Sequence, residues 1–315
     1  MSSPGLGGAA VIGHTPAESS STSDRVRQTV ALLSRRGFAL DAPRLASLCL
    51  GGAVGEDDVR WAVAASADLT FTHDLVLQRS DGTRAVAIRS RAADHASDAP
   101  RYLEMTVRFV RTLVKVAPFI RSVSIAGSLA SGGFRASDDV DLNLIVDDGR
   151  RHLAYVAVNA LGILHALRHR AKPVDDLTRR PLAPRLMTAN LILERSQCHP
   201  LARQDEDMAF ELLMSQPVFG LDVVREVVEA NPALLDHFPQ LASRSAVLAI
   251  DSAARPWLPG WLFPAAFDGI ARNIGGAAWR LMQWTRRDKP EALARVAYVR
   301  ATMRPYTLFD ETGPT

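Results

Sequence analysis

Two aspartates alternate with apolar residues at one point of the chain. Asp139 and Asp141 flank Val140, and a strand-forming run, residues 142–146, follows. Side chains two apart on a strand point to the same face, so both carboxylates would stand next to each other. Such a pair repels unless a cation lies between the two groups, and hard oxygen ligands suit Mg²⁺ completed by substrate phosphates. The alternation therefore predicts a metal site formed by Asp139 and Asp141.

A second group of residues precedes this pair by about ten positions. The apolar run that ends at Ile125 leads into Gly127 and Ser128. Glycine lets the main chain approach a ligand closely, and serine adds a hydroxyl, so the dipeptide suits phosphate oxygens. Arg135, in the intervening loop, is a candidate for a further phosphate contact, with an ordinary exposed loop arginine as the alternative. Together the two groups predict a joint phosphate and metal site.

The combination resembles the motif of the DNA polymerase β-like nucleotidyltransferase superfamily: an apolar strand, Gly127-Ser128, a loop, then Asp139-x-Asp141 in a strand. The resemblance covers residues 120–147. It implies a small mixed sheet flanked by helices, two Mg²⁺ ions, and transfer of a nucleoside monophosphate from a nucleoside triphosphate with release of pyrophosphate. The acceptor could be a small molecule, a protein or an RNA end. A weaker likeness, over residues 25–240, is to bacterial nucleotidyltransferase-domain proteins that begin with a winged-helix-like segment.

The superfamily usually supplies a third carboxylate from a later strand. In the strand predicted over residues 186–196, Asn190 takes the matching inward position, and an amide cannot act as a base. Glu194 shares a face with Asn190 if the strand is regular, so Glu194 is the predicted third catalytic acid; a solvated strand-end residue is the alternative. Asn190 also supports a second function, a binding or regulatory protein that keeps the fold without the chemistry.

The elements that position these residues follow from apolar periodicity and turn signals. We expect an α+β fold with a small mixed β-sheet core flanked by helices. The sequence predicts helices and strands, in chain order, over residues 101–117 (helix), 122–128 (strand), 139–146 (strand), 150–170 (helix), 186–196 (strand), 205–220 (helix) and 221–238 (helix). An extended connection is expected over residues 172–185.

Segments on either side of the core complete the predicted domain organisation. Three short helices between residues 24 and 68, the first capped by Asp24, precede two strand-like runs joined by a turn at residues 80–82. This is the order of a winged helix, which either binds DNA or packs against the rest of the chain; packing is the expected role. The predicted domains are 1–23 (disordered leader), 24–95 (winged-helix-like), 96–240 (nucleotidyltransferase core) and 241–315 (helical C-terminal segment).

Composition limits the remaining function classes. The 315 residues carry a net charge of +3 and two cysteines, Cys49 and Cys198, without disulfide or zinc spacing. No apolar run is as long as a membrane span. These features predict a cytoplasmic protein that does not enter a membrane.

Three further groups of residues have types or spacings that occur in functional sites. Arg151 and His152, beyond the second motif strand, are secondary phosphate candidates. His165 and His169 have metal-binding spacing but lack a nearby acid, so a basic helix face is the preferred interpretation. The adjacent pair Cys198-His199 is discounted as a nucleophile and base, because neighbouring side chains rarely face each other.

Overall fold

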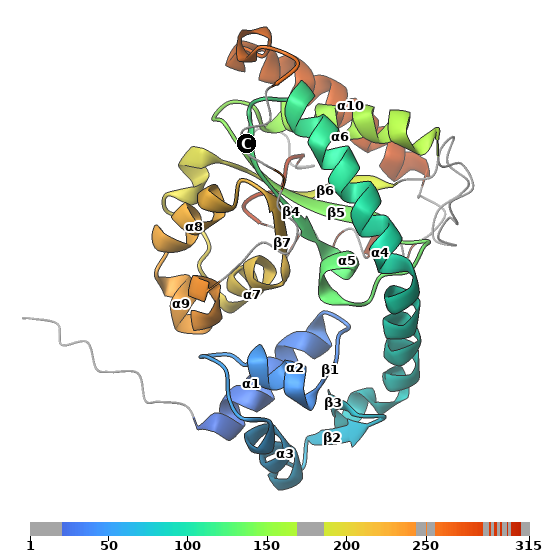
Figure 1. Cartoon of the computed structure of the whole chain (residues 1–315), viewed down its shortest axis with the longest axis vertical. Helices are drawn as coiled ribbons and strands as arrows, with labels where there is room; N and C mark the ends of the chain where they lie inside the picture. Colours follow the sequence, from blue (N-terminus) through green and yellow to red (C-terminus); the bar gives the residue numbers. More distant parts are fainter. Residues whose placement is uncertain are drawn as a thin grey trace, which may run out of the picture.

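The computed structural model describes residues 21–168, 186–243, 250, 256–285, 290, 293–294, 297, 301 and 304–309. These residues form an α+β fold with two small sheets surrounded by helices (Figure 1). Residues 1–20 of the predicted leader and the predicted connection at 172–185 lie outside the described residues. The first helix begins three residues earlier than predicted, because Ser21 rather than Asp24 is the N-cap and accepts a hydrogen bond from the Asp24 main-chain N–H at 3.2 Å.

The first 64 described residues, 21–84, form what we call the N-terminal module. Its elements are α1 (Thr22–Arg35), β1 (Leu40–Asp41), α2 (Ala42–Ser47), α3 (Glu56–Ala65), β2 (Leu69–Thr72) and β3 (Leu75–Gln78). The three strands pair antiparallel in the order β1-β3-β2. The hairpin turn predicted at residues 80–82 is wrong. The chain turns at His73 and Asp74, which both have positive φ, and residues 79–84 form a 3₁₀ helix instead.

A single long helix, α4 (Ala85–Val116), links the module to the rest of the chain. The strand predicted before residue 91 and the helix start predicted near Pro100 are both wrong, because α4 already begins at Ala85. The predicted domain boundary at 95/96 therefore falls inside α4. Alanine is the strongest helix former and is frequent in the first half of α4, which explains the early start. Pro100 is accommodated within the helix, where it removes one main-chain donor.

The second sheet carries the motif residues. Its elements, with the intervening helices, are β4 (Ile120–Ala126), α5 (Gly127–Ser131), β5 (Val140–Val146), α6 (Arg151–Ala166), β6 (Met187–Glu194), α7 (Glu206–Met214) and β7 (Gln216–Phe219). The strand order is β6-β5-β4-β7, with β5 parallel to β6 and β4 antiparallel to both neighbours, so the sheet is mixed as predicted. The helix predicted over 205–220 ends at Met214, and the edge strand β7 was missed.

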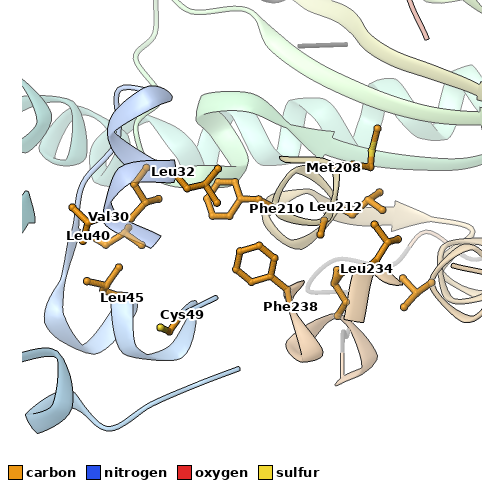
Figure 2. Packing of buried hydrophobic residues seen from close by; sticks show 14 of the residues in the cluster. Val30, Leu32, Leu40, Leu45, Cys49, Met208, Phe210, Leu212, Leu234 and Phe238 are labelled. Carbon is orange, nitrogen blue, oxygen red and sulfur yellow. The ribbon is translucent and has the colours of Figure 1, made fainter. Parts of the chain in front are cut away.

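Each face of this sheet is covered differently. Val140, Leu142 and Leu144 are buried on one face in a cluster that includes side chains of α4 and α6. The opposite face contributes Ile145, Leu191 and Leu193 to a second cluster with α7, α8 (Leu221–Glu229), α9 (Ala233–His237) and the N-terminal module. In Figure 2, Leu32 and Leu45 of the module lie opposite Phe210 and Phe238 of α7 and the end of α9. The module thus shares a hydrophobic core with the sheet.

The C-terminal segment packs beside α6. Helix α10 (Asp268–Thr285) agrees with the helical C-terminal segment predicted over residues 241–315. The Asp268 carboxylate caps α6 by accepting hydrogen bonds from the main-chain N–H groups of His152 and Leu153, both at 2.9 Å. Shorter 3₁₀ turns span Arg195–Cys198, Pro239–Ser243, Gly260–Leu262 and Ala265–Phe267. None of the helices described has both the length and the apolar character needed to cross a membrane.

Candidate functional site

The Gly127 turn and Asp141 meet at one end of the sheet. Ala126, the last residue of β4, pairs with Asp141 of β5, and the chain turns into α5 at Gly127 with a φ of 61°. A Cβ at Gly127 would overlap the Asp141 carboxylate. Glycine is therefore required here for two reasons, its left-handed backbone and the close approach of Asp141. The fold brings the two halves of the motif together, as the sequence predicted.

The predicted alternation is confirmed from Val140, the first residue of β5, onward. Val140 and Leu142 are fully buried on one face of the sheet. Asp141 pairs with Thr188 on the neighbouring parallel strand, and the Thr188 hydroxyl donates to Asp141 Oδ1 at 2.7 Å. Asp139, just ahead of β5, and Asp141 both remain partly accessible to solvent. Both carboxyl groups thus belong to partly exposed residues at the start of β5.

Asp138 organises the loop that precedes β5. Its Oδ2 atom accepts from the Ser128 hydroxyl at 3.1 Å and from the Arg135 main-chain N–H at 3.2 Å. The Arg91 guanidinium of α4 lies 3.5 Å from the same oxygen. Asp138 therefore ties the beginning of α5 to the end of the loop. Ser128 keeps its place at the predicted phosphate position, with its hydroxyl proton donated to this carboxylate.

Arg135 turns toward α4. Its Nε atom donates to Asp94 at 2.8 Å and its Nη2 atom to Ser90 at 3.3 Å. These two bonds hold the Arg135 guanidinium beside α4, so a phosphate contact would have to use its other N–H groups or open the ion pair. The predicted role as a phosphate ligand stays a prediction, with a competing partner now identified.

Helix α4 holds the rest of the loop, a role that the sequence did not reveal. The His95 ring Nδ1 accepts from the Phe134 main-chain N–H at 3.3 Å, and Asp98 accepts from the Ala136 N–H at 3.1 Å. The ring of Phe134 packs on that of Tyr102 at 4.7 Å between centroids. Burial, and secondarily the positive charge of Arg44, lowers the pKa of His95, which favours the neutral ring that can accept this hydrogen bond.

The assignment of Glu194 as the third acid is wrong on geometric grounds. Glu194 pairs with Val146, five residues beyond Asp141 on β5, or roughly 16 Å along the strand. Cross-strand partners point to the same face, so Glu194 lies on the face of Val146, opposite to that of Asp141. Its Oε1 atom accepts from the Gly149 main-chain N–H at 3.1 Å. Glu194 supports the turn after β5 and takes no part in the candidate site.

A bulge in β6 places Asn190 in a polar cluster that the sequence analysis missed. The register shifts between Leu142 and Asn143, and Asn190 is the extra residue. Its Nδ2 atom donates to Asn143 Oδ1 at 3.0 Å and to Glu211 Oε1 at 3.2 Å. Asn143 also donates to Glu211 Oε1, at 3.1 Å. Glu211 belongs to α7, where a lone acid within the apolar run 208–214 was the available signal.

The secondary candidates serve structural roles. Arg151 donates to the main-chain oxygens of Ile192 and Tyr306, at 3.1 and 2.7 Å, and the His152 ring pairs with Asp268 at 2.7 Å. His165 packs against Phe109, whereas His169 lies outside the described residues. Burial raises the pKa of Cys198 to about 12, which keeps this thiol protonated and unreactive.

A cleft of about 560 Å³ lies at the opposite end of the sheet. It is lined by the bidentate ion pair of Arg121 and Asp147 and by the pair of Arg195 and Glu226, together with apolar side chains. Asp147 directly follows β5, at the far end from Asp141. This cleft is therefore separate from the candidate site, and its charged side chains are largely paired with one another.

Comparisons with known proteins identify no relative: no family model, curated protein or solved structure matches the chain. Within the described ranges there is no group of three or more histidine, cysteine, aspartate or glutamate side chains arranged to hold a metal ion. The metal-ligating candidates remain Asp139 and Asp141.

Proposed function

We propose that this protein is a metal-dependent nucleotidyltransferase, which transfers a nucleoside monophosphate from a nucleoside triphosphate to an acceptor and releases pyrophosphate. The observation that carries the proposal is the direct approach of the Gly127 main chain to the Asp141 carboxylate. It places a turn suited to phosphate oxygens against a carboxylate pair suited to a divalent cation.

The topology around the site supports the proposal. The order α4-β4-α5-β5-α6-β6, with β4 antiparallel and β6 parallel to β5, agrees with the small mixed sheet implied by the resemblance to the DNA polymerase β-like superfamily. The turn between β4 and β5 contains Gly127 and Ser128, and β5 begins between the two aspartates. The motif residues thus lie together where β4 ends and β5 begins, which supports the proposal.

The donor set fits Mg²⁺. Asp139 and Asp141 offer hard oxygen ligands near solvent, and Mg²⁺ is commonly held by one or two carboxylates while phosphates and waters complete its octahedron. When bound, the ion would neutralise phosphate charge and lower the pKa of an attacking hydroxyl. Within the protein, the Thr188 hydroxyl orients one Asp141 oxygen and leaves the other turned toward Gly127.

The test is pyrophosphate release from each of the four nucleoside triphosphates with Mg²⁺, with small hydroxyl compounds, proteins and RNA supplied in turn as acceptors. The proposal predicts release that depends on Mg²⁺ with at least one triphosphate. A purified, folded protein that binds none of the four would end both this proposal and the next.

The side chains of β6 next to the site favour a second function, a binding or regulatory protein. Thr188 lies beside Asp141 and Asn190 beside Asn143, so the positions next to the site carry a hydroxyl and an amide rather than a third carboxylate. A protein that binds the triphosphate as a regulatory signal without turnover would have this composition. It predicts Mg²⁺-dependent binding with no pyrophosphate release under any acceptor.

DNA binding by the N-terminal module is a separate part of this second function. The order α1-β1-α2-α3-β2-β3 and the sheet order β1-β3-β2 support a winged-helix-like module. Its third helix, however, begins with Glu56, Asp57 and Asp58, a charge that phosphates repel. We expect a DNA mobility assay at low salt to show no shift; a salt-sensitive shift would support a DNA-binding regulator.

A further inference from the structure

Arg36 connects the N-terminal module with the helix α7 that packs on the sheet of the candidate site. Arg36, at the C-cap of α1, donates from Nη2 to the main-chain oxygen of Asp207 at 2.9 Å and to its carboxylate at 3.1 Å. Its Nη1 atom donates to Glu211 Oε2 at 3.2 Å, and the guanidinium stacks 5.0 Å from the centre of the Phe210 ring. The Arg36 side chain is only 23% exposed and that of Glu211 15%. This is a partly buried, multiply bonded ion pair, unlike a mobile surface pair.

The second oxygen of Glu211 continues the connection into the sheet. Glu211 Oε1 accepts from the amides of both Asn143 and Asn190. Asn143 lies two residues after Asp141 on the same face of β5. Asn190 lies two residues after Thr188, whose hydroxyl holds Asp141. Asp141 and Thr188 thus form one hydrogen-bonded pair between β5 and β6, and Asn143 and Asn190 form the next pair, two residues further along both strands.

The bulge in β6 is bonded to Glu211, the partner of Arg36. An extra residue in a strand locally disrupts the ladder and re-aims side chains, so its conformation depends on what holds it. Here the extra residue is Asn190, which bonds Asn143 and Glu211. Without the guanidinium, the Glu211 carboxylate would lose its cationic partner. Its bonding partner Asn143 is two residues after Asp141 on β5. The carboxylate would then be free to leave the two amides.

We propose that Arg36 is a positioning residue of the candidate site: through Glu211 and the two asparagines it fixes the register of β6 against β5 and so the orientation of Asp141. The part of this proposal that concerns binding of Mg²⁺ and nucleotide rests on the proposed function. It assigns the N-terminal module a part in forming the site, in addition to any binding of its own.

The experiment compares Arg36→Gln with Arg35→Gln in the full chain. Arg35 is the matched control, because it is the next residue along and also pairs with α7, at 2.6 Å from Glu206, but its side chain is half exposed and the pair leads to no site residue. The readout is the Mg²⁺ concentration that half-saturates binding of the preferred triphosphate. We expect Arg36→Gln to raise it by about three- to tenfold, with saturation regained at higher Mg²⁺, and Arg35→Gln to change it less than twofold.

Arg36→Lys should recover part of the loss, because the ammonium keeps the charge beside Glu211 but lacks the guanidinium fork. A general loss of structure would instead lower binding at every Mg²⁺ concentration. Unchanged or tighter Mg²⁺ binding in Arg36→Gln would overturn the proposal; tighter binding would mean that Arg36 keeps Glu211 away from the metal.

A measurement without nucleotide separates this inference from the proposed function. Amide hydrogen exchange of the isolated protein reports the β6 ladder directly. We expect faster exchange over residues 187–191 in Arg36→Gln and in Glu211→Gln, but not in Arg35→Gln. Exchange that is equal in all three overturns the inference even if nucleotide binds. The expected change in a protein that binds no nucleotide would leave the inference standing and remove the proposed function. If Arg36→Gln does not fold, Glu211→Gln, which keeps an acceptor for both amides, decides the outcome alone.

Discussion

At the scale of single residues, Gly127 carries the sharpest structural requirement. Alanine at this position would have to hold a left-handed backbone, at about 1–2 kcal/mol, and displace the Asp141 carboxylate. We expect Gly127→Ala to lower the free energy of unfolding by about 1–3 kcal/mol and to abolish Mg²⁺-nucleotide binding. Gly133→Ala in the same loop is the control, since its Cβ would meet no atom within 4 Å. Equal nucleotide affinity in both variants would show that the Gly127 turn is not part of the site.

His95 gives a residue-level prediction in pH. Its pKa is lowered in the folded protein, so the unfolded chain takes up a proton first, near pH 6.5. The stability that the hydrogen bond from Phe134 to His95 contributes is therefore complete above that pH. It is lost as the pH falls through the lower pKa that His95 has in the folded protein. Urea unfolding should therefore show that the free energy of unfolding falls more between pH 7.5 and pH 5 for the wild type than for His95→Asn. The asparagine amide oxygen can accept the same hydrogen bond at both pH values. Identical losses would exclude this role.

At the scale of elements, the motif could be predicted and its neighbours could not. Alternation identified β5 and the face of Asp141, because a half-buried strand leaves that pattern in any sequence. The prediction that Glu194 lies beside the aspartates failed because it depends on how β6 pairs with β5. β5 and β6 are parallel, so the start of one lies beside the start of the other, and the bulge at Asn190 moves later residues by one position. Neither property can be read from one strand alone.

Two further elements were missed for reasons of context. β7 is four residues long and contains Pro217, which is tolerated because the strand lies at the sheet edge. The hairpin turn at His73 and Asp74 uses positive φ without glycine, whereas the stronger turn signal at residues 80–82 belongs to a 3₁₀ helix. In both cases tertiary packing outweighed local preference.

At the scale of the whole molecule, the shared core predicts that the N-terminal module and the sheet unfold together. Leu32 of α1 is fully buried among side chains of both parts, facing Phe210 (Figure 2). Leu32→Ala should lower the stability by about 2–5 kcal/mol and move a single calorimetric transition to lower temperature. Val86→Ala, at a site that is 65% exposed, should leave it within about 0.5 kcal/mol. Two separated transitions, with only one shifted by Leu32→Ala, would show that the module is an independent domain.

The central claim is that Asp139, Asp141 and the Gly127 turn form one site for Mg²⁺ and a nucleoside triphosphate. Its most direct test is calorimetric titration of the four triphosphates, with and without Mg²⁺, into the wild type and into Asp139→Asn/Asp141→Asn. This double variant should fold normally, because it removes two like charges and keeps an oxygen for the Thr188 hydroxyl. The account predicts binding by the wild type that requires Mg²⁺, and at least about a hundredfold weaker binding by the variant. Wild-type binding that is equal without Mg²⁺, or equal affinity in the variant, would contradict it.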